Sequence, residues 1–156
     1  MSDTQWQERI AALEAKDEVR ELIATYCSLN DALTRLDELV GLFTDDAVMV
    51  NAAGDHVGRA AIGAYYRAFF DGSTEFARHH TMNQVIDILE PGVARHRSYF
   101  IAFLGRQGDS KIAFGEYDDV LVKTAEGWRF SRKVNHVAGI TTAESGWARG
   151  FAGAVR

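Results

Sequence analysis

A change in the spacing of apolar residues divides the chain into two parts. Up to about residue 72 these residues recur every three or four positions, which is typical of amphipathic helices. From about residue 78 the spacing changes to two, the period of half-buried β-strands. Helices followed by a run of strands indicate an α+β domain, with the helices on one face of a curved sheet.

Three helices are predicted in the first part. The longest covers QWQERIAALEAKDEVRELIATYCSL, with a break expected near Lys16–Asp17. The second is LTRLDELVGLF and the third is RAAIGAYYRAFFDG, which ends at Gly72. A short strand pair around Val48–Val50, with a turn at Asn51–Asp55, is expected between them.

Four long strands are predicted in the second part, at about 78–90, 93–105, 110–124 and 127–138. The connections EPGV, GRQGDS and TAEG are short enough to join them as antiparallel hairpins. A sheet of this length must bend around its helices. We therefore expect a concave, partly apolar cavity between sheet and helices, where small ligands usually bind.

Composition narrows the classes of protein. The 156 residues contain no linker or repeat, which predicts one domain over 1–156. A formal net charge of −5 argues against a nucleic-acid partner, and the scattered Lys and Arg residues argue against a membrane surface. Cys27 is the only cysteine, so no intrachain disulfide can form. With no signal-like or membrane-spanning segment in the sequence, a cytoplasmic location is expected.

Adjacent histidines, His79 and His80, open the first long strand. Neighbouring side chains of a strand point to opposite faces, so only one of the two can face the cavity. We predict that His79 faces inward and that His80 packs on the outer face with Met82. Asn83 shares the parity of His79, so it either lines the pocket or satisfies nearby backbone groups.

The last strand and the third helix provide further candidates. Trp128, Arg132 and His136 share one strand face in an alternating register. Trp128 is expected in the core or at the pocket wall. Arg132 and His136 are candidates to reach the cavity and bind an anionic or phenolic group, although an outward-facing salt bridge is the more common role of an Arg. Tyr65 and Phe69 of the third helix are expected to wall the cavity or to close its mouth.

Other titratable residues are predicted to lie outside the site. Asp118 and Asp119 alternate, so one points inward and one outward, most simply at a solvated edge. His56 and His96 are assigned to surface or loop positions. Side chains of HH in a strand diverge, so no metal site is predicted. The sequence also has no glycine-rich nucleotide motif and no serine nucleophile elbow, so no cofactor is expected.

The segments EVRELIATYCSLNDA, LFTDDAVM, VGRAAI, RHHTMNQVI and GEYDDVLVKTAEGWRFSRK occur in a characteristic order. In this order they resemble the SnoaL-like branch of the nuclear-transport-factor-2-like superfamily over nearly the whole chain. The resemblance implies an α+β-barrel, a cone of three helices wrapped by a strongly bent antiparallel sheet. The superfamily includes dehydratases, a dehydrochlorinase, ketosteroid isomerase and polyketide cyclases, as well as members without known chemistry.

The resemblance also implies catalytic residues. It places a catalytic Asp on Asp31 and a catalytic His on His79, and a dehydratase-like pattern adds Tyr26. The Asp that such dehydratases carry on the following strand has no counterpart in RSYFIAF. In this pattern Asp31 would fix the imidazole tautomer while His79 removes a proton from carbon. Tyr26 would assist the leaving group or an oxyanion.

The expected function is that of a cofactor-independent lyase or isomerase acting on a hydrophobic cyclic or aromatic small molecule. The resemblance suggests a homotrimer, with a dimer as second choice. One alternative is a non-catalytic binding or association module of the same fold. Others are a polyketide-cyclase-like or ketosteroid-isomerase-like enzyme with an Asp base, and a dioxygenase β-subunit. Contact between Asp31 and His79, far apart in the sequence, would favour the lyase.

Overall fold

The computed structural model describes residues 2–146, and the predicted domain, 1–156, extends beyond them at both ends. The helices are α1 (Asp3–Ala32), α2 (Leu36–Gly41) and α3 (Arg59–Phe69). The strands are β1 (Phe43–Asn51), β2 (Gly54–Val57), β3 (Thr74–Glu90), β4 (Val93–Arg106), β5 (Asp109–Thr124) and β6 (Gly127–Thr141). No helix within the described residues is both long enough and apolar enough to cross a membrane.

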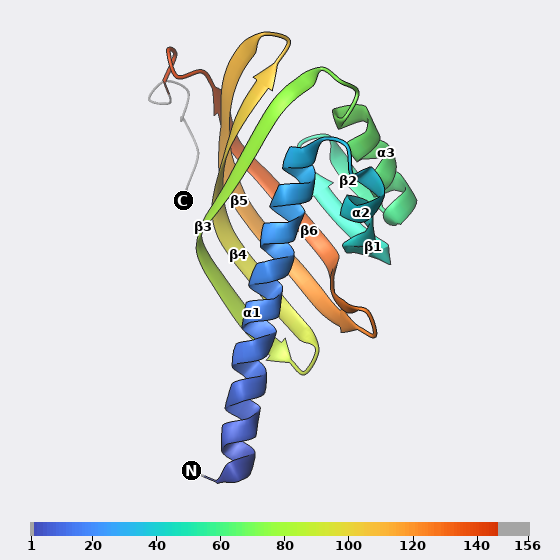
Figure 1. Ribbon diagram of the computed structural model, residues 1–156, viewed down its shortest axis with the longest axis vertical. Coiled ribbons are helices and arrows are strands. Elements are labelled where there is room, and N and C mark those ends of the chain that lie inside the picture. The colour runs from blue at the N-terminus through green and yellow to red at the C-terminus, as the bar shows by residue number, and fades with distance from the viewer. Residues whose placement is uncertain (1, 147–156) are drawn as a thin grey trace.

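All six strands form one sheet in the order β2-β1-β6-β5-β4-β3. Strands β3 to β6 are an antiparallel meander, as predicted, whereas β1 joins the sheet parallel to β6. The sheet curls around α1 without closing, and α2 and α3 lie at the end of the sheet that carries β1 and β2 (Figure 1). The predicted α+β fold is confirmed, with a partial barrel in place of a closed one.

Helix α1 is continuous, so the break predicted near Lys16–Asp17 is wrong. Ser2 and Gln5 form a capping box at its start, and the following sequence is rich in Ala, Glu and Leu, which favour helix. Its first half projects beyond the sheet, and Figure 1 shows this overhang. The interrupted apolar pattern therefore reflects exposure to solvent rather than the end of a helix.

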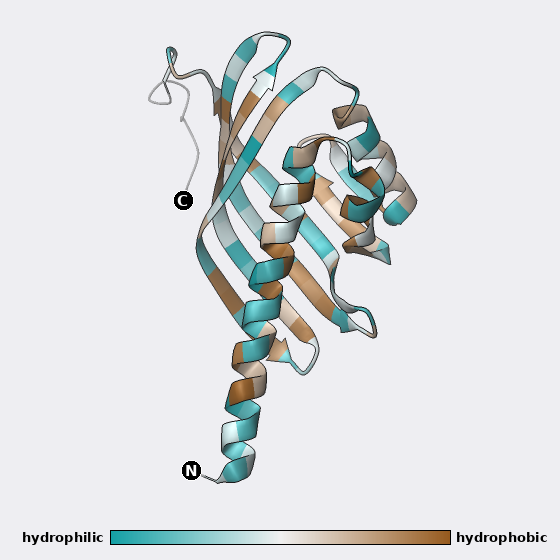
Figure 2. Cartoon of the chain, viewed as in Figure 1, coloured by the Kyte–Doolittle hydropathy of each residue, from teal (hydrophilic) through white to brown (hydrophobic). Residues whose placement is uncertain are grey.

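The core lies between the second half of α1 and the concave face of the sheet. Aromatic rings dominate its centre, where Tyr26 packs edge-on against Phe130 and Tyr117 at centroid distances of 5.5 and 6.3 Å. Along β4, buried residues alternate with exposed ones, and Figure 2 shows hydrophilic and hydrophobic residues interspersed along the strands of the meander. This alternation gives the sheet one core face and one outer face.

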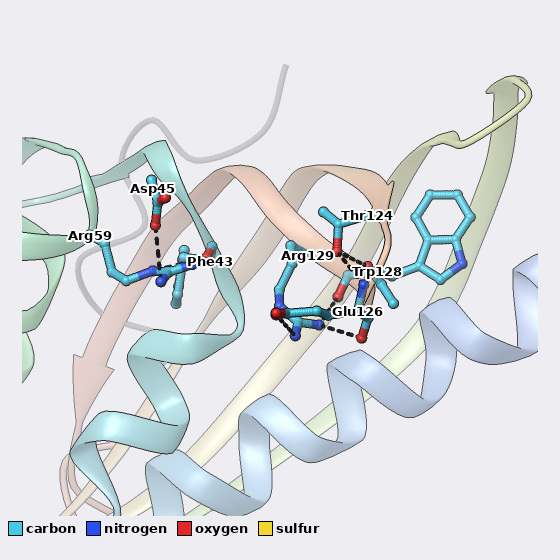
Figure 3. Close-up of polar contacts among 8 residues, drawn as sticks. Phe43, Asp45, Arg59, Thr124, Glu126, Trp128 and Arg129 are labelled. Carbon is cyan, nitrogen blue, oxygen red and sulfur yellow. Dashed lines mark hydrogen bonds and ion pairs between the residues drawn. The ribbon is translucent and has the colours of Figure 1, made fainter.

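Arg59 fastens the start of α3 to β1. Its guanidinium donates to the carbonyl oxygen of Phe43 at 2.6 Å and pairs with Asp45 at 2.9 Å (Figure 3). Gly58 precedes the helix with a φ of 83°, a conformation that glycine adopts without strain. This anchoring holds the aromatic face of α3 over one end of the concave sheet.

Of the β-bulges in β3 and β6, one in each strand changes the facing of predicted site residues. In β3 the register shifts between Met82 and Val85, and Asn83 adopts a left-handed φ of 55°. In β6 the register shifts between Phe130 and Arg132, so that one extra residue is inserted. A bulge reverses the alternation that follows it. If odd-numbered residues face inward before the bulge, even-numbered residues face inward after it, and the reverse holds as well.

Candidate active site

A cavity of about 160 Å³ lies between α1, α3 and the concave face of the sheet. Apolar and aromatic side chains form most of its wall. The lining residues are Tyr26, Asn30, Met49, Asn51, Tyr65, Tyr66, Phe69, His79, Phe100, Ala102, Leu104, Ala113, Asn135, Val137 and Ile140. The cavity therefore includes the predicted site residues His79, Tyr26, Tyr65 and Phe69.

His79 and Asp31 meet at the edge of this cavity. Asp31 lies in the last turn of α1, and its carboxylate accepts a bond from His79 Nδ1 at 2.6 Å. The same carboxylate accepts the backbone N–H of His79, at 3.0 and 3.1 Å. The two side chains are only 10% and 13% exposed. When Nδ1–H donates this hydrogen bond to the carboxylate, the lone pair of the neutral imidazole lies on Nε2.

Asn30 is the nearest polar neighbour of that lone pair. Its amide nitrogen lies 3.5 Å from His79 Nε2, and the residue is 5% exposed. Asn30 and Asp31 are consecutive in the last turn of α1, so a single helix end places both beside the imidazole. Asn30 is not among the site residues predicted from the sequence, although its position beside Asp31 was a usable signal.

A pair of phenols lies farther along the wall. The hydroxyl groups of Tyr26 and Tyr66 are 2.8 Å apart and buried. Burial is the main reason why the pKa values of both phenols lie well above the usual value of a tyrosine. Both residues therefore remain protonated and able to donate hydrogen bonds. Tyr66 is not among the residues that the sequence predicts to line the cavity.

A fully buried cluster of charged side chains packs behind Tyr26, outside the lining of the cavity. Lys133 lies 3.2 Å from Asp119, and His96 Nδ1 lies 3.0 Å from the same carboxylate. The Lys133 ammonium also sits 4.1 Å from the ring centre of Tyr26. His96 was predicted at a surface or loop position, and the Asp118–Asp119 pair at a solvated edge. Both predictions are wrong where they concern His96 and Asp119, which are fully buried.

Asn83 does not line the cavity, contrary to prediction. It lies in the β3 bulge, is exposed, and borders a separate depression on the outer face of the sheet. The bulge begins after His79, so the inward position of His79 is unaffected. His80 is exposed and meets Phe103 on the outer face, at a ring distance of 5.8 Å.

Arg132, His136 and Trp128 are also absent from the cavity, contrary to prediction. The bulge in β6 turns Arg132 and His136 outward and brings Lys133 and Asn135 inward. Trp128 precedes this bulge and is buried elsewhere, where its indole nitrogen donates to Glu18 at 2.7 Å. Asn135 is therefore the polar residue that β6 contributes to the cavity.

Potential metal ligands do not gather at this site. Within residues 2–146, no three His, Cys, Asp or Glu side chains lie close enough together to share an ion. The titratable group that faces the cavity beside the phenols is the imidazole of His79. The arrangement can exchange a proton at Nε2 and donate hydrogen bonds from the phenols.

The SnoaL-like domain model matches residues 11–134, most of the chain. The chain belongs to the SnoaL-like family. This agrees with the resemblance seen in the sequence and with the curled sheet of the structure. No curated protein matches the sequence significantly.

Several solved structures have the same fold as this SnoaL-like protein. A proposed scytalone dehydratase from Novosphingobium aromaticivorans is 22% identical, with a TM-score of 0.79 over 85% of this chain and 90% of the other. The hexachlorocyclohexane dehydrochlorinase LinA is 12% identical, with a TM-score of 0.78 over 86% and 92%. An NTF2-like protein with a cystatin-like fold from N. aromaticivorans is 25% identical, with a TM-score of 0.69 over 87% and 90%.

Proposed function

We propose that this SnoaL-like protein is a cofactor-independent lyase or isomerase that acts on a small hydrophobic cyclic or aromatic compound. The observation that carries the proposal is the 2.6 Å contact between Asp31 and His79 at the edge of a largely apolar cavity. The names of two structural neighbours, a dehydratase and a dehydrochlorinase, support the same reaction class.

His79 is the proposed base. Asp31 holds the proton on Nδ1 and stabilises the imidazolium that forms when Nε2 takes a proton from a substrate carbon. The electron pair of the broken C–H bond then forms a double bond to the adjacent carbon. In an elimination this expels halide, or hydroxide that leaves as water with a proton from Tyr26. In an isomerisation the charge moves onto a carbonyl oxygen as an enolate, and the His79 imidazolium then returns the proton to a different carbon.

Tyr26 is the proposed donor to the developing negative charge. Its hydroxyl, paired with that of Tyr66, is positioned to donate to a departing oxygen or an enolate oxygen. The raised pKa values of both phenols keep these protons in place near neutral pH. The Tyr26 proton therefore assists departure, while the proton removed from carbon is held on His79.

The test compares the two adjacent histidines. Wild type, His79→Gln and His80→Gln are assayed for elimination from hexachlorocyclohexane, and for deuterium exchange at the α-carbon of cyclohexenone in D₂O. We expect His79→Gln to lower kcat by about 100- to 10,000-fold, because it removes the general base. His80→Gln, on the outer face, should keep wild-type rates.

Asp31→Asn should also lower kcat strongly, because the imidazolium loses its charged partner. Circular dichroism and thermal unfolding check that each variant is folded. Full activity in His79→Gln would contradict the proposed base. Binding of ring compounds without turnover in the wild type would favour the non-catalytic binding module.

We further propose that the protein is a cytoplasmic homotrimer, with a dimer as second choice and without a nucleic-acid or membrane partner. Support for self-association comes from large apolar side chains exposed on the outer face of β3 and β4. They include Met82, Val85, Leu89, Tyr99 and Phe103, which are 40–59% exposed. The net charge of −5 supports the absence of a nucleic-acid partner.

A further inference from the structure

We infer that the cavity takes an uncharged compound of a single six-membered ring that carries a hydroxyl group. The inference deepens the proposed function, on which it rests for the reaction. The binding itself follows from three properties of the cavity: its volume, the charges around it and the buried polar atoms on its wall.

Volume limits the ligand to one ring. The cavity measures about 160 Å³, and an apolar protein cavity of about 150 Å³ holds benzene. Phe100 is fixed in place by stacking on Tyr117 at 4.6 Å, and Tyr66 is fixed by its bond to Tyr26. A second fused ring would have to displace packed core residues of this kind, which is costly.

The charges around the cavity select an uncharged ligand. Among the described residues that line it, none is Lys, Arg, Asp or Glu. Lys133 lies behind Tyr26 and is paired with Asp119, while Asp31 already accepts two N–H groups of His79. A carboxylate or an ammonium would therefore lose its water without gaining a free counter-ion, which disfavours both.

Two buried amide oxygens select a hydroxyl group. Oδ1 of Asn30 and Oδ1 of Asn135 are both buried, and neither has a hydrogen-bond partner within residues 2–146. Both residues line the cavity, one from α1 and one from β6. A buried acceptor without a donor is unfavourable, and a ligand O–H would satisfy it. The phenol pair of Tyr26 and Tyr66 offers a donor for a second ligand oxygen.

The experiment measures binding of four probes to the full-length wild-type protein by isothermal titration calorimetry. Phenol carries one ring and one hydroxyl, benzene lacks the hydroxyl, benzoate adds a charge, and 2-naphthol adds a ring. We expect phenol to bind about tenfold more tightly than benzene, the effect of one additional hydrogen bond. Benzoate and 2-naphthol should bind more weakly than phenol.

A matched pair of variants assigns the preference to the cavity amide. Asn135→Leu should reduce the preference for phenol over benzene, because only the Asn30 oxygen then remains as an acceptor, whereas Asn83→Leu on the outer face should leave it unchanged. Thermal unfolding verifies that both variants fold. The wild-type comparison needs no variant, so it decides the question even if Asn135→Leu does not fold.

Several outcomes would overturn the inference. They are the absence of phenol binding at millimolar concentration, equal affinity for benzene, or tighter binding of benzoate or 2-naphthol. His79→Gln separates this inference from the proposed reaction, because it should keep the preference for phenol while losing turnover. Loss of turnover in this variant with an intact preference supports both proposals. Turnover by the wild-type protein without a preference for phenol overturns only the ligand class.

Discussion

At the scale of single residues, Lys133 is the most unusual feature of the core. Its side chain is fully buried, and its ammonium pairs with Asp119 and faces the rings of Tyr26 and Tyr117. Taking one partner away from a buried ion pair leaves an uncompensated charge. The stability of the cavity wall is therefore tied to a pair that the catalytic proposal does not require.

We predict that Lys133→Met lowers the free energy of unfolding by about 3–5 kcal/mol, because Asp119 stays buried without its cation. Replacing both partners, as Lys133→Met with Asp119→Leu, should restore much of that loss. Urea denaturation measures each value. Arg132→Met, which changes the exposed neighbour, is the control and should stay within about 0.5 kcal/mol of wild type. A single variant as stable as wild type would show that the pair contributes nothing.

At the scale of elements, Glu18 ties α1 to the β5–β6 hairpin. Its carboxylate accepts from Lys123 and from Trp128 Nε1, the latter at 2.7 Å. These two hydrogen bonds, that of Lys123 first, lower the pKa of Glu18 below its usual value. A lowered carboxylate pKa means that the stabilisation is present above the unfolded-state pKa of about 4.3 and is lost as pH falls through the folded-state value.

We predict that Glu18→Gln destabilises the protein at pH 7 and has no effect once the pH lies below the folded-state pKa. The side chain is 48% exposed, so solvent screening limits the effect at pH 7 to less than about 1 kcal/mol. Urea denaturation at pH 7 and at a pH below the folded-state pKa measures the free energy of unfolding of each variant. Glu14→Gln, on the exposed half of α1, is the control. An equal loss at both pH values would mean that packing, rather than charge, links α1 to the hairpin.

Elements also show where sequence reasoning succeeded and where it failed. The position of His79 was predictable because the strand alternation is regular from Phe76 to Met82. Asn83 lies within that bulge, and Arg132 and His136 follow the one in β6. A single extra residue leaves almost no mark on a period-two pattern, so the sequence could not show that the facing reverses.

At the scale of the whole molecule, the exposed apolar strip on β3 and β4 bears on the proposed trimer. We predict a sedimentation mass three times that of one chain, measured by analytical ultracentrifugation. Leu89→Lys, which places a charge on a residue that is 59% exposed, should shift the population to lower mass. The matched change Leu13→Lys, on the projecting half of α1, should not. A monomeric wild-type protein would contradict the proposed assembly.

The whole fold was more predictable than the cavity. The order of helices and strands follows from hydrophobic spacing and turn residues, which are local properties of the chain. The Tyr26–Tyr66 pair and the Asp119–Lys133 pair join distant segments, and no local pattern specifies such partners. Asp31 and His79 were paired in advance only because the family resemblance supplied the contact.

The parallel pairing of β1 with β6 has a consequence for the synthesis of the chain. Phe43 and Phe130 are register partners, so β1 leaves the ribosome long before its neighbour exists. Until then β1 and β2 form at most a lone two-stranded hairpin, which is marginally stable in water. Asn135 and Val137 of β6 also complete the cavity wall. The binding site is thus assembled only after β6 has been translated, and a chain stopped before β6 would expose an unpaired strand edge prone to aggregation.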